Sequence, residues 1–543
     1  MSSKRELSMG QLNEIYSGHT SAAASHATRQ SRCSAAIKAS VHGVIALLGA
    51  TAAIADPYPL SPILGGITWN EGSKQRYTTH ADLWDSAWAS DDNVYAWWGD
   101  GFGFSGQHKA QMGLSQLSGS PADGGLIGLD VFYGMENPPE CPGNSPPILG
   151  GKPTGTLALA NSLIYSLHSS GADLGGGNCA SQWLARSLDN GAFWTDHIGN
   201  VEWPDANGFA PSAVLQYGRA QAGALAPDRT AIPYVYLYGT KSSQPVYEQY
   251  LARVPAVPSN SIELSSNWQY YAGADSHGNP LWNASSALAR PVWVDTNNGQ
   301  WLSVTFDKAI GRYLAYNDHG SACGGQPCER QVSLFDAPSP WGPWTTFDYE
   351  NEFDNVGCGS NCLGNAVEVS WSMMQKWFSP DGLTLWPEYS STGAYDTLNL
   401  IEGTMRLAAS STVKGLAIST GTPAVLDKVS LENPGNLEYI DRTYRLTQVP
   451  SRYLGLEMIR LANNDKWASV SNYVTFTSTV AQNLCLAWDP GNPVPAWLSS
   501  WTRTGDKLVG NATFEVYRKA IPAGTVHVPG SAANDNYLLL VGC

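Results

Sequence analysis

Two aspartates, Asp82 and Asp100, lie on either side of a predicted hairpin. Two strand-like runs are separated there by residues 90–93, Ser-Asp-Asp-Asn, whose types favour tight turns. In an antiparallel hairpin, Asp82 before the turn and Asp100 after it come near the same end of neighbouring strands. Hydrolysis of a glycosidic bond needs one carboxyl group to protonate the leaving oxygen and another to activate water or attack the sugar. The spacing therefore predicts a carboxylate pair suited to this chemistry, with turn or strand-end capping as the structural alternative.

Aromatic side chains surround these two aspartates. Trp84, Trp88, Trp97 and Trp98 lie on the same predicted strands, and Phe102 follows the second strand. Flat apolar rings can stack on sugar faces and exclude water. We predict Trp84, Trp98 and Phe102 as substrate contacts. Because side chains alternate between the two faces of a strand, core packing is the alternative for each tryptophan.

Other chemical motifs are absent from the sequence or lack support. The run GFGFSG at 101–106 matches a dinucleotide-binding pattern, but no helical pattern follows it. No GxSxG or GxxxxGK(S/T) run occurs, which argues against serine-hydrolase and nucleotide chemistry. No CxxC, HxH or HExxH spacing occurs, and the ten histidines are scattered. We therefore predict neither a metal site nor a cofactor.

Two further runs have the pattern of an Asp-box. Residues 187–194 read SLDNGAFW, and residues 379–386, SPDGLTLW, resemble a shortened version. In this resemblance Asp189 and Asp381 cap backbone N–H groups at hairpins, so we interpret both as folding turns. Sialidases share the Asp-box, but their chemistry needs an arginine cluster for the substrate carboxylate, and spacing alone does not establish one here.

The composition predicts an all-β protein. The 543 residues include 55 Gly, 33 Pro, 21 Trp and 25 Tyr, which favour short strands and tight turns over long helices. Only 14% of the residues are charged and 43% are hydrophobic, which is enough for a substantial core. The formal net charge of −15 argues against binding to nucleic acid or anionic membrane surfaces, which depends mainly on Lys and Arg. A neutral partner such as a glycan suits this charge better.

Sequence patterns divide the chain into four parts. Residues 1–55 resemble an export signal, because basic residues precede an apolar run, VHGVIALLGATAAIA, that ends in a small-x-small site and is short for a membrane span. Residues 56–410 contain five groups of short aromatic strands and turns, which predicts a five-bladed β-propeller. We expect a linker at 411–432 and a C-terminal β-sandwich at 433–543, serving glycan binding or packing. The export signal predicts a secreted protein without a stable membrane span.

The cysteines agree with export. Only Cys33 of the nine precedes the predicted cleavage site, so eight remain to pair. Cys323 with Cys328, and Cys358 with Cys362, are close enough to close small loops. The other four are Cys141, Cys179, Cys485 and Cys543. We predict four disulfides and no free thiol in the exported protein.

A series of motifs along the predicted propeller resembles one known family. The first are ADLW and VYAWWGDGFGF, which contain Asp82 and Asp100. The later motifs, in order, are NGFAPSAVLQYG, YVYLYGT, YLARVP, GRYLAYND, APSPWGPW, KWFSPDGLTLW and YDTLNL, and the series covers roughly residues 66–405. The series resembles the family once called domain of unknown function 4185, now partly classed as glycoside hydrolase family 183.

This resemblance implies a specific activity. Members with a known activity are endo-D-arabinanases, which cut the arabinofuranose polymer of mycobacterial and related cell walls with inversion. Their two essential aspartates lie in the first-blade motifs, at positions matched by Asp82 and Asp100. We assign Asp82 as general base and Asp100 as general acid, with carboxyl carbons about 6.5–9.5 Å apart. We expect a monomer acting on arabinan or another cell-wall polysaccharide; a non-catalytic glycan-binding propeller and a sialidase-like exo-glycosidase are the alternatives.

Overall fold

Short strands dominate the structure. The computed structural model describes residues 57–543, except 79, 135–150, 170–181, 223–232, 246, 277, 297, 320–321, 324–325, 328–330, 350–366, 392–393 and 432–434. Helical structure in the described residues is confined to short 3-10 turns: η1 (Pro121–Asp123), η2 (Arg219–Gln221), η3 (Ser259–Glu263), η4 (Ser265–Asn267), η5 (Ser286–Leu288), η7 (Gln375–Trp377), η8 (Ser451–Tyr453), η9 (Asn463–Asp465) and η10 (Ala496–Ser500). The all-β class is therefore confirmed. None of these helices is long and apolar enough to cross a membrane, and the predicted export signal lies outside the described residues.

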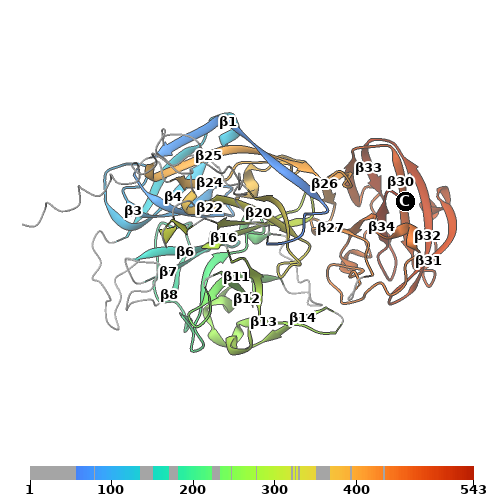
Figure 1. The fold of residues 1–543 in the computed structure, drawn as a ribbon, viewed down its shortest axis with the longest axis horizontal. Helices are drawn as coiled ribbons and strands as arrows, with labels where there is room; N and C mark the ends of the chain where they lie inside the picture. The colour runs from blue at the N-terminus through green and yellow to red at the C-terminus, as the bar shows by residue number, and fades with distance from the viewer. Residues whose placement is uncertain are drawn as a thin grey trace, which may run out of the picture. The chain divides into compact units, whose positions relative to one another are not determined.

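Five antiparallel sheets make up the larger part of the described chain (Figure 1). The first contains β2 (Asp82–Trp88), β3 (Val94–Gly101), β4 (Ala110–Ser118) and β5 (Ile127–Tyr133), and the second β6 (Lys152–Ala158), β7 (Ile164–Ser169), β8 (Gln182–Ser187) and β9 (Glu202–Trp203). The third contains β10 (Phe209–Val214), β11 (Tyr234–Lys241), β12 (Glu248–Pro255), β13 (Gln269–Ala274), β14 (Pro280–Asn283) and β15 (Pro291–Val294). The fourth contains β16 (Asn298–Asp307), β17 (Arg312–His319), β20 (Gln331–Ala337) and β21 (Thr345–Tyr349), and a small ribbon is formed by β18 (Ala322–Cys323) and β19 (Gln326–Pro327). The fifth contains β22 (Val367–Ser372), β23 (Thr384–Leu385), β24 (Glu388–Ser391), β25 (Ala394–Leu407) and β1 (Leu64–Thr78).

The five sheets are arranged in a closed ring. The first strands of consecutive sheets contact one another in the order β2, β6, β10, β16 and β22, and β22 contacts β2 again. The fifth sheet joins both ends of this region, because β1 pairs with β25 from Leu64 opposite Leu407 to Thr78 opposite Leu398. Figure 1 shows β1, in blue, along β25, in orange. We call residues 64–407 the ring region.

The five strands that contact one another around the ring, which we call the inner strands, all run in the same direction. The carbonyl of Ser90, after β2, accepts a hydrogen bond from Arg219, which follows β10. Gln216, also after β10, forms a parallel bridge with Thr305 of β16. Lys376, after β22, donates to the carbonyl of Asp92. The chain segments that follow the inner strands therefore gather on one face, the end face, and the first residues of these strands lie on the opposite start face.

Neighbouring sheets bury each other's tryptophans. Trp84 and Trp98 of the first sheet share an apolar cluster with Leu400 of the fifth sheet and with Trp377 of η7, the turn that follows β22. Trp97 points to the other side and packs with residues of the second sheet. Both faces of the first sheet are therefore apolar, which explains why its strands lack a clean alternation of polar and apolar residues.

The C-terminal region, residues 413–541, forms two further antiparallel sheets. One contains β26 (Val413–Ile418), β29 (Val474–Ser478) and β33 (Gly524–Val528). The other contains β27 (Val425–Lys428), β28 (Glu457–Arg460), β34 (Leu538–Val541), β30 (Gln482–Trp488), β32 (Thr513–Ile521) and β31 (Thr502–Val509). The segment 411–432, predicted as a linker, carries β26 and β27, whose backbones pair with β29 and β28.

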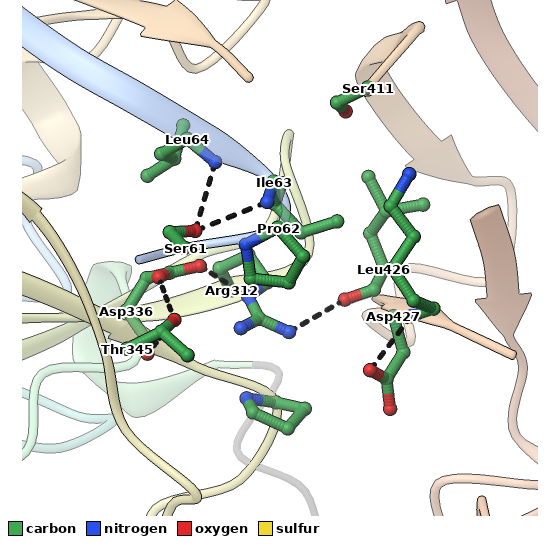
Figure 2. Close-up of polar contacts among 12 residues, drawn as sticks. Ser61, Pro62, Ile63, Leu64, Arg312, Asp336, Thr345, Ser411, Leu426 and Asp427 are labelled. Atoms are coloured by element: carbon green, nitrogen blue, oxygen red, sulfur yellow. Dashed lines mark hydrogen bonds and ion pairs between the residues drawn. The ribbon is translucent and has the colours of Figure 1, made fainter. Parts of the chain in front are cut away.

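A buried arginine connects the ring region to the C-terminal region (Figure 2). Arg312 of β17 donates from Nε to Asp336 Oδ2 at 2.7 Å and from Nη1 to the Leu426 carbonyl of β27 at 3.0 Å. Asp336 Oδ1 also accepts from the Thr345 hydroxyl at 2.5 Å. Gly311 approaches β27 so closely that a Cβ there would lie 2.6 Å from the backbone nitrogen of Leu426. The two regions therefore meet through backbone and buried charge within one compact unit.

One disulfide lies in the described part of the chain, between two cysteines whose partners the sequence left open. Cys485 of β30 and Cys543 are bonded across 58 residues. The side chains of the other six cysteines expected to pair lie outside the described residues. Those pairings stay predictions.

Candidate functional site

The two predicted catalytic aspartates lie on the start face. Strands β2 and β3 form the predicted hairpin, in which Asp82 lies opposite Gly99, the residue before Asp100. The expected placement of both aspartates near one end of neighbouring strands is confirmed. The turn at the other end contains Asp91, whose carboxylate accepts hydrogen bonds from Asn93 and Tyr95. Asp91 is therefore a turn residue, as its position in the sequence predicts.

The backbone around Asp82 and Asp100 adopts costly conformations. Leu83 and Asp100 have φ angles of 58° and 44°, and the pairing of β2 with β3 shifts register after Asp82. Non-glycine residues held at such angles cost roughly 1–3 kcal/mol each, and they cluster at functional sites. Two of the ten non-glycine residues with positive φ in the described part of the chain therefore lie beside the two carboxylates.

Two glycines flank Asp100 because their positions leave no room for a side chain. A Cβ on Gly99 would lie 2.6 Å from the Leu83 side chain and 3.1 Å from Asp82 Oδ1. A Cβ on Gly101 would lie 1.9 Å from the His80 carbonyl oxygen. The run Gly-Asp-Gly therefore lets β3 press against β2 at the height of Asp82.

A lysine from the second sheet completes this group. Lys152, the first residue of β6, forms an ion pair with Asp100. The Lys152 side chain is 5% exposed and that of Asp100 is 54% exposed, whereas Asp82 as a residue is 7% exposed. The group thus combines an accessible, ion-paired carboxylate with a mostly buried carboxyl group. Lys152 was missed at the sequence level because it lies outside the hairpin and no local motif marks it.

Of the three predicted substrate contacts, two tryptophans are buried and one phenylalanine is partly exposed. The indoles of Trp84 and Trp98 are fully buried and donate to the Ala81 carbonyl and the Ser115 hydroxyl. The prediction that they stack on a sugar is therefore wrong, since neighbouring sheets cover both rings. Phe102 is 36% exposed next to the Gly-Asp-Gly run, so it stays available as a contact.

Two further acidic groups lie on β2 and on β24, a strand of the fifth sheet that contacts β2. Asp85 of β2 accepts from the Thr156 hydroxyl at 2.5 Å, and burial raises the pKa of Asp85 to about 6. Burial, with a smaller contribution from the negative charge of Asp85, raises the pKa of Glu388 of β24 to about 8. Glu388 is therefore neutral at pH 7 and can donate a proton. No sequence motif identified it, because ring closure alone brings it near β2.

Both Asp-box runs form turns. Asp189 Oδ1 accepts from the Phe193 backbone N–H and bonds the Ser187 hydroxyl, and Asp381 Oδ1 does the same for Leu383 and Ser379. Their interpretation as folding turns is confirmed. Asp381 also forms an ion pair with Lys414 at 3.2 Å, which fastens this turn to the C-terminal region.

Metal ligands are not grouped in the described residues. No three His, Cys, Asp or Glu side chains of the described part come together as a metal site would require.

Comparison with known proteins gives no family assignment. No family model and no curated protein matches the chain. Among solved structures, an endo-arabinase from Bacteroides thetaiotaomicron is similar with 8% identity over 61% of this chain and 96% of that one, at a TM-score of 0.35. A GH43_1 enzyme from Xanthomonas citri is similar with 15% identity over 65% of this chain and 93% of that one, at a TM-score of 0.34. An exo-β-1,3-galactanase from Phanerochaete chrysosporium is similar with 11% identity over 85% of this chain and 96% of that one, also at a TM-score of 0.34. Since these TM-scores lie below 0.5, the inferences that follow depend on this chain's own residues.

Proposed function

We propose that the protein is a secreted glycoside hydrolase with Asp82 and Asp100 as its catalytic pair. The observation that carries the proposal is the group on the start face, where two carboxyl groups, a buried lysine and two strained residues converge. Few structural needs explain such strain in a hairpin that ordinary turn residues already close. In this proposal the five sheets are the blades of a propeller and the C-terminal sheets form a sandwich.

The environments of the two aspartates favour roles opposite to those assigned from the sequence. Asp100 is accessible and held by the Lys152 ammonium, and a carboxylate in such an ion pair is the form that accepts a proton. Asp82 is mostly buried beside Leu83, and a carboxyl group in such surroundings is of the type that serves as general acid. We therefore propose Asp100 as the base and Asp82 as the acid.

The reaction follows from these roles. Asp100 takes a proton from a water molecule, which attacks the anomeric carbon while Asp82 protonates the departing oxygen. One bond to the anomeric carbon forms as the other breaks on the opposite side, so the configuration inverts. Lys152 acts as a positioning residue, because its ammonium group holds the Asp100 carboxylate in an ion pair.

The proposed substrate is an arabinofuranosyl polymer. This choice comes from the resemblance of the first-blade motifs and of the ordered series after them to the endo-D-arabinanase family. The net charge of −15 also suits a neutral glycan better than a polyanion.

Released sugars test the proposal directly. The full chain is incubated with arabinogalactan, lipoarabinomannan or plant arabinan, and products are separated and their anomeric configuration followed by NMR. Asp82→Asn and Asp100→Asn should each fold and lose activity by several orders of magnitude, because each removes a proton-transfer step. Asp91→Asn, at the other end of the same hairpin, is the matched control and should keep most activity.

Two outcomes would decide against the proposal. Near-normal turnover by either folded variant on the start face would return that aspartate to a structural role. Binding of these glycans without any product from the wild-type protein would favour the non-catalytic glycan-binding alternative.

A further inference from the structure

The loop 102–109 begins two residues after Asp100 and joins β3 to β4 on the start face. The Phe102 N–H donates to the His80 carbonyl at 2.6 Å. A second bond, from the Gly106 N–H to the Phe102 carbonyl at 3.3 Å, closes the first turn of the loop. The loop is therefore tied to the backbone that leads into β2 as well as to the end of β3.

Asp130 of β5 fixes the middle of this loop. Its Oδ1 accepts from the Phe104 N–H at 3.0 Å and from the Ser115 hydroxyl at 2.6 Å. Its Oδ2 accepts from the Ser105 N–H and from the Tyr133 hydroxyl, both at 2.8 Å. Burial alone would raise the pKa of Asp130, but these hydrogen bonds outweigh it and lower the pKa, so the carboxylate is ionised at neutral pH. Bonds to a charged acceptor are stronger than neutral ones, so one side chain fastens two consecutive residues of the loop.

Close packing leaves the loop no room to shift. Gly103 has a φ of 63°, and a Cβ there would lie 2.3 Å from Asp130 Oδ1. The Phe104 ring packs edge-on against Trp84 with 5.5 Å between centroids, and a Cβ on Gly128 would lie 2.2 Å from the Phe104 ring. The loop is therefore held against both β2 and β5, and the side chains it carries are presented in fixed positions.

Three aromatic side chains stay open to solvent around this loop. Phe102 and His108 are exposed, and Tyr133 is partly exposed. The His108 ring packs edge-on against the Tyr133 ring with 5.3 Å between centroids. Because the Tyr133 hydroxyl donates its single proton to Asp130, it accepts from the Ser105 hydroxyl at 2.7 Å. The polar end of Tyr133 is therefore occupied, and the three side chains offer flat aromatic surfaces to a ligand.

These aromatic side chains extend outward from the proposed catalytic group across the first sheet. Tyr133 lies opposite Gly113 of β4, and Gly113 lies opposite Trp98, two residues before Asp100 on β3. Since neighbouring strands lie about 4.8 Å apart, about 10 Å of sheet separates Tyr133 from β3. The aromatic surface thus begins beside Asp100 and continues over the outer strands, which suits a chain of sugar units better than one small molecule.

We propose that Phe102, His108 and Tyr133 form a binding subsite for a neutral sugar unit next to the one that is cleaved. Asp130 is the positioning residue of this subsite, because it holds the loop beside Asp100. The inference rests on the proposed function, since its occupant is the glycan that the proposed catalytic pair would cleave. Aromatic rings pack against the apolar faces of sugars, and rings that are fixed beforehand lose little freedom on binding.

Affinity electrophoresis tests the subsite without depending on hydrolysis. The full chain carrying Asp82→Asn, which leaves the polymer intact, is run in native gels that contain arabinogalactan, lipoarabinomannan or plant arabinan. At least one polymer should retard the protein saturably. Adding Phe102→Ala or His108→Ala should weaken this binding about three- to tenfold, the order that one aromatic contact supplies. Phe193→Ala, which removes a phenylalanine that is 78% exposed on the Asp-box turn after β8, is the matched control and should leave binding unchanged.

A double-mutant cycle tests the positioning role of Asp130. Asp130→Asn keeps the shape of the side chain but replaces one acceptor oxygen by an NH₂ group, so binding should weaken by a similar factor. In a protein that already carries Phe102→Ala and His108→Ala, the same substitution should have little further effect, because it acts through the lost aromatic rings. An equal effect in both backgrounds would overturn the positioning role. Tyr133→Phe, which keeps the ring and removes the hydroxyl bound to Asp130, serves if thermal unfolding shows that Asp130→Asn does not fold.

Hydrolysis supplies an independent readout. In the active protein, Phe102→Ala, His108→Ala and Asp130→Asn should raise KM and leave kcat nearly unchanged, because the subsite holds substrate and transition state alike. The inference is overturned if no polymer binds saturably, or if all three folded variants bind and hydrolyse as their parents do. Binding that these variants weaken, without any sugar released by the wild-type protein, would refute only the proposed function. Released sugar with binding and KM that no variant changes would refute only the subsite.

Discussion

Replacement of Arg312 by methionine should strongly destabilise the protein. The guanidinium and the Asp336 carboxylate are 2% and 0% exposed as side chains, and they are joined at 2.7 Å. Removing one partner of a buried ion pair leaves the other charge buried, which costs about 3–5 kcal/mol. The Leu426 carbonyl also loses its 3.0 Å bond, and an unsatisfied buried acceptor adds to the cost. Methionine fills part of the volume, so we expect the free energy of unfolding to fall by about 3–5 kcal/mol.

Urea unfolding followed by tryptophan fluorescence measures this loss. Arg503→Met is the matched control, because Arg503 is 60% exposed and its ion pair with Glu515 lies at the surface. Surface pairs contribute about 0–1 kcal/mol, so the control should unfold almost as the wild type does. The double variant Arg312→Met with Asp336→Leu should recover much of the loss, since no charge stays buried alone. If Arg312→Met and Arg503→Met lower stability equally, the buried Arg312–Asp336 pair contributes no more to stability than a surface ion pair does.

Three further predictions concern other parts of the chain. The pKa of Glu388 rises from 4.5 in the unfolded chain to about 8 in the folded protein, so the native state binds more protons between these pH values and stability falls as pH rises. Glu388→Gln should remove this pH dependence and raise the free energy of unfolding at pH 9 by up to about 5 kcal/mol. Urea unfolding of both proteins across this pH range measures the effect, and parallel pH profiles would refute it. Cys485→Ser opens a 58-residue loop and should cost about 4 kcal/mol relative to the oxidised protein, with no difference expected once both are reduced. Gly101→Ala pushes a methyl group into the His80 carbonyl, so activity on arabinan should drop at least tenfold. Gly125→Ala, where a Cβ meets nothing within 4 Å, is the control and should leave activity unchanged; equal activity of the two variants would contradict the close approach at Gly101.

Local chemistry explains what could be predicted from the sequence. The hairpin that carries Asp82 and Asp100 and the Asp189 turn depend on residues a few positions apart, and their patterns indicated both. Lys152 and Glu388 could not be found in this way, because both come from other sheets. Lys152 reaches Asp100 only when the second sheet packs against the first, and Glu388 reaches β2 only when the fifth sheet closes the ring. The tryptophan prediction failed for a related reason. Trp84 and Trp98 lie under neighbouring sheets, and a single strand does not reveal that both of its faces will be covered.

The segment 411–432 shows a second limit of sequence patterns. Its two glycines, one proline and three serines are typical of a linker, yet residues 413–418 and 425–428 are strands. Such short strands become stable when a partner strand supplies the hydrogen bonds, and propensity alone does not report a distant partner. Truncation within this segment would therefore remove strands from both C-terminal sheets.

The pairing of β1 with β25 also bears on the order in which the chain can fold. Leu64 and Leu407 lie opposite each other, so the ring stays open until the chain has been made beyond residue 407. Contacts between such distant residues form slowly, because a long loop must close before they contribute any stability. The first four sheets can assemble on their own hairpins, but the apolar face of the first sheet stays uncovered until the fifth sheet packs against it. Aggregation should therefore compete with folding at this last step, and a chain cut in a surface loop between sheets should be tolerated better than one that lacks β1.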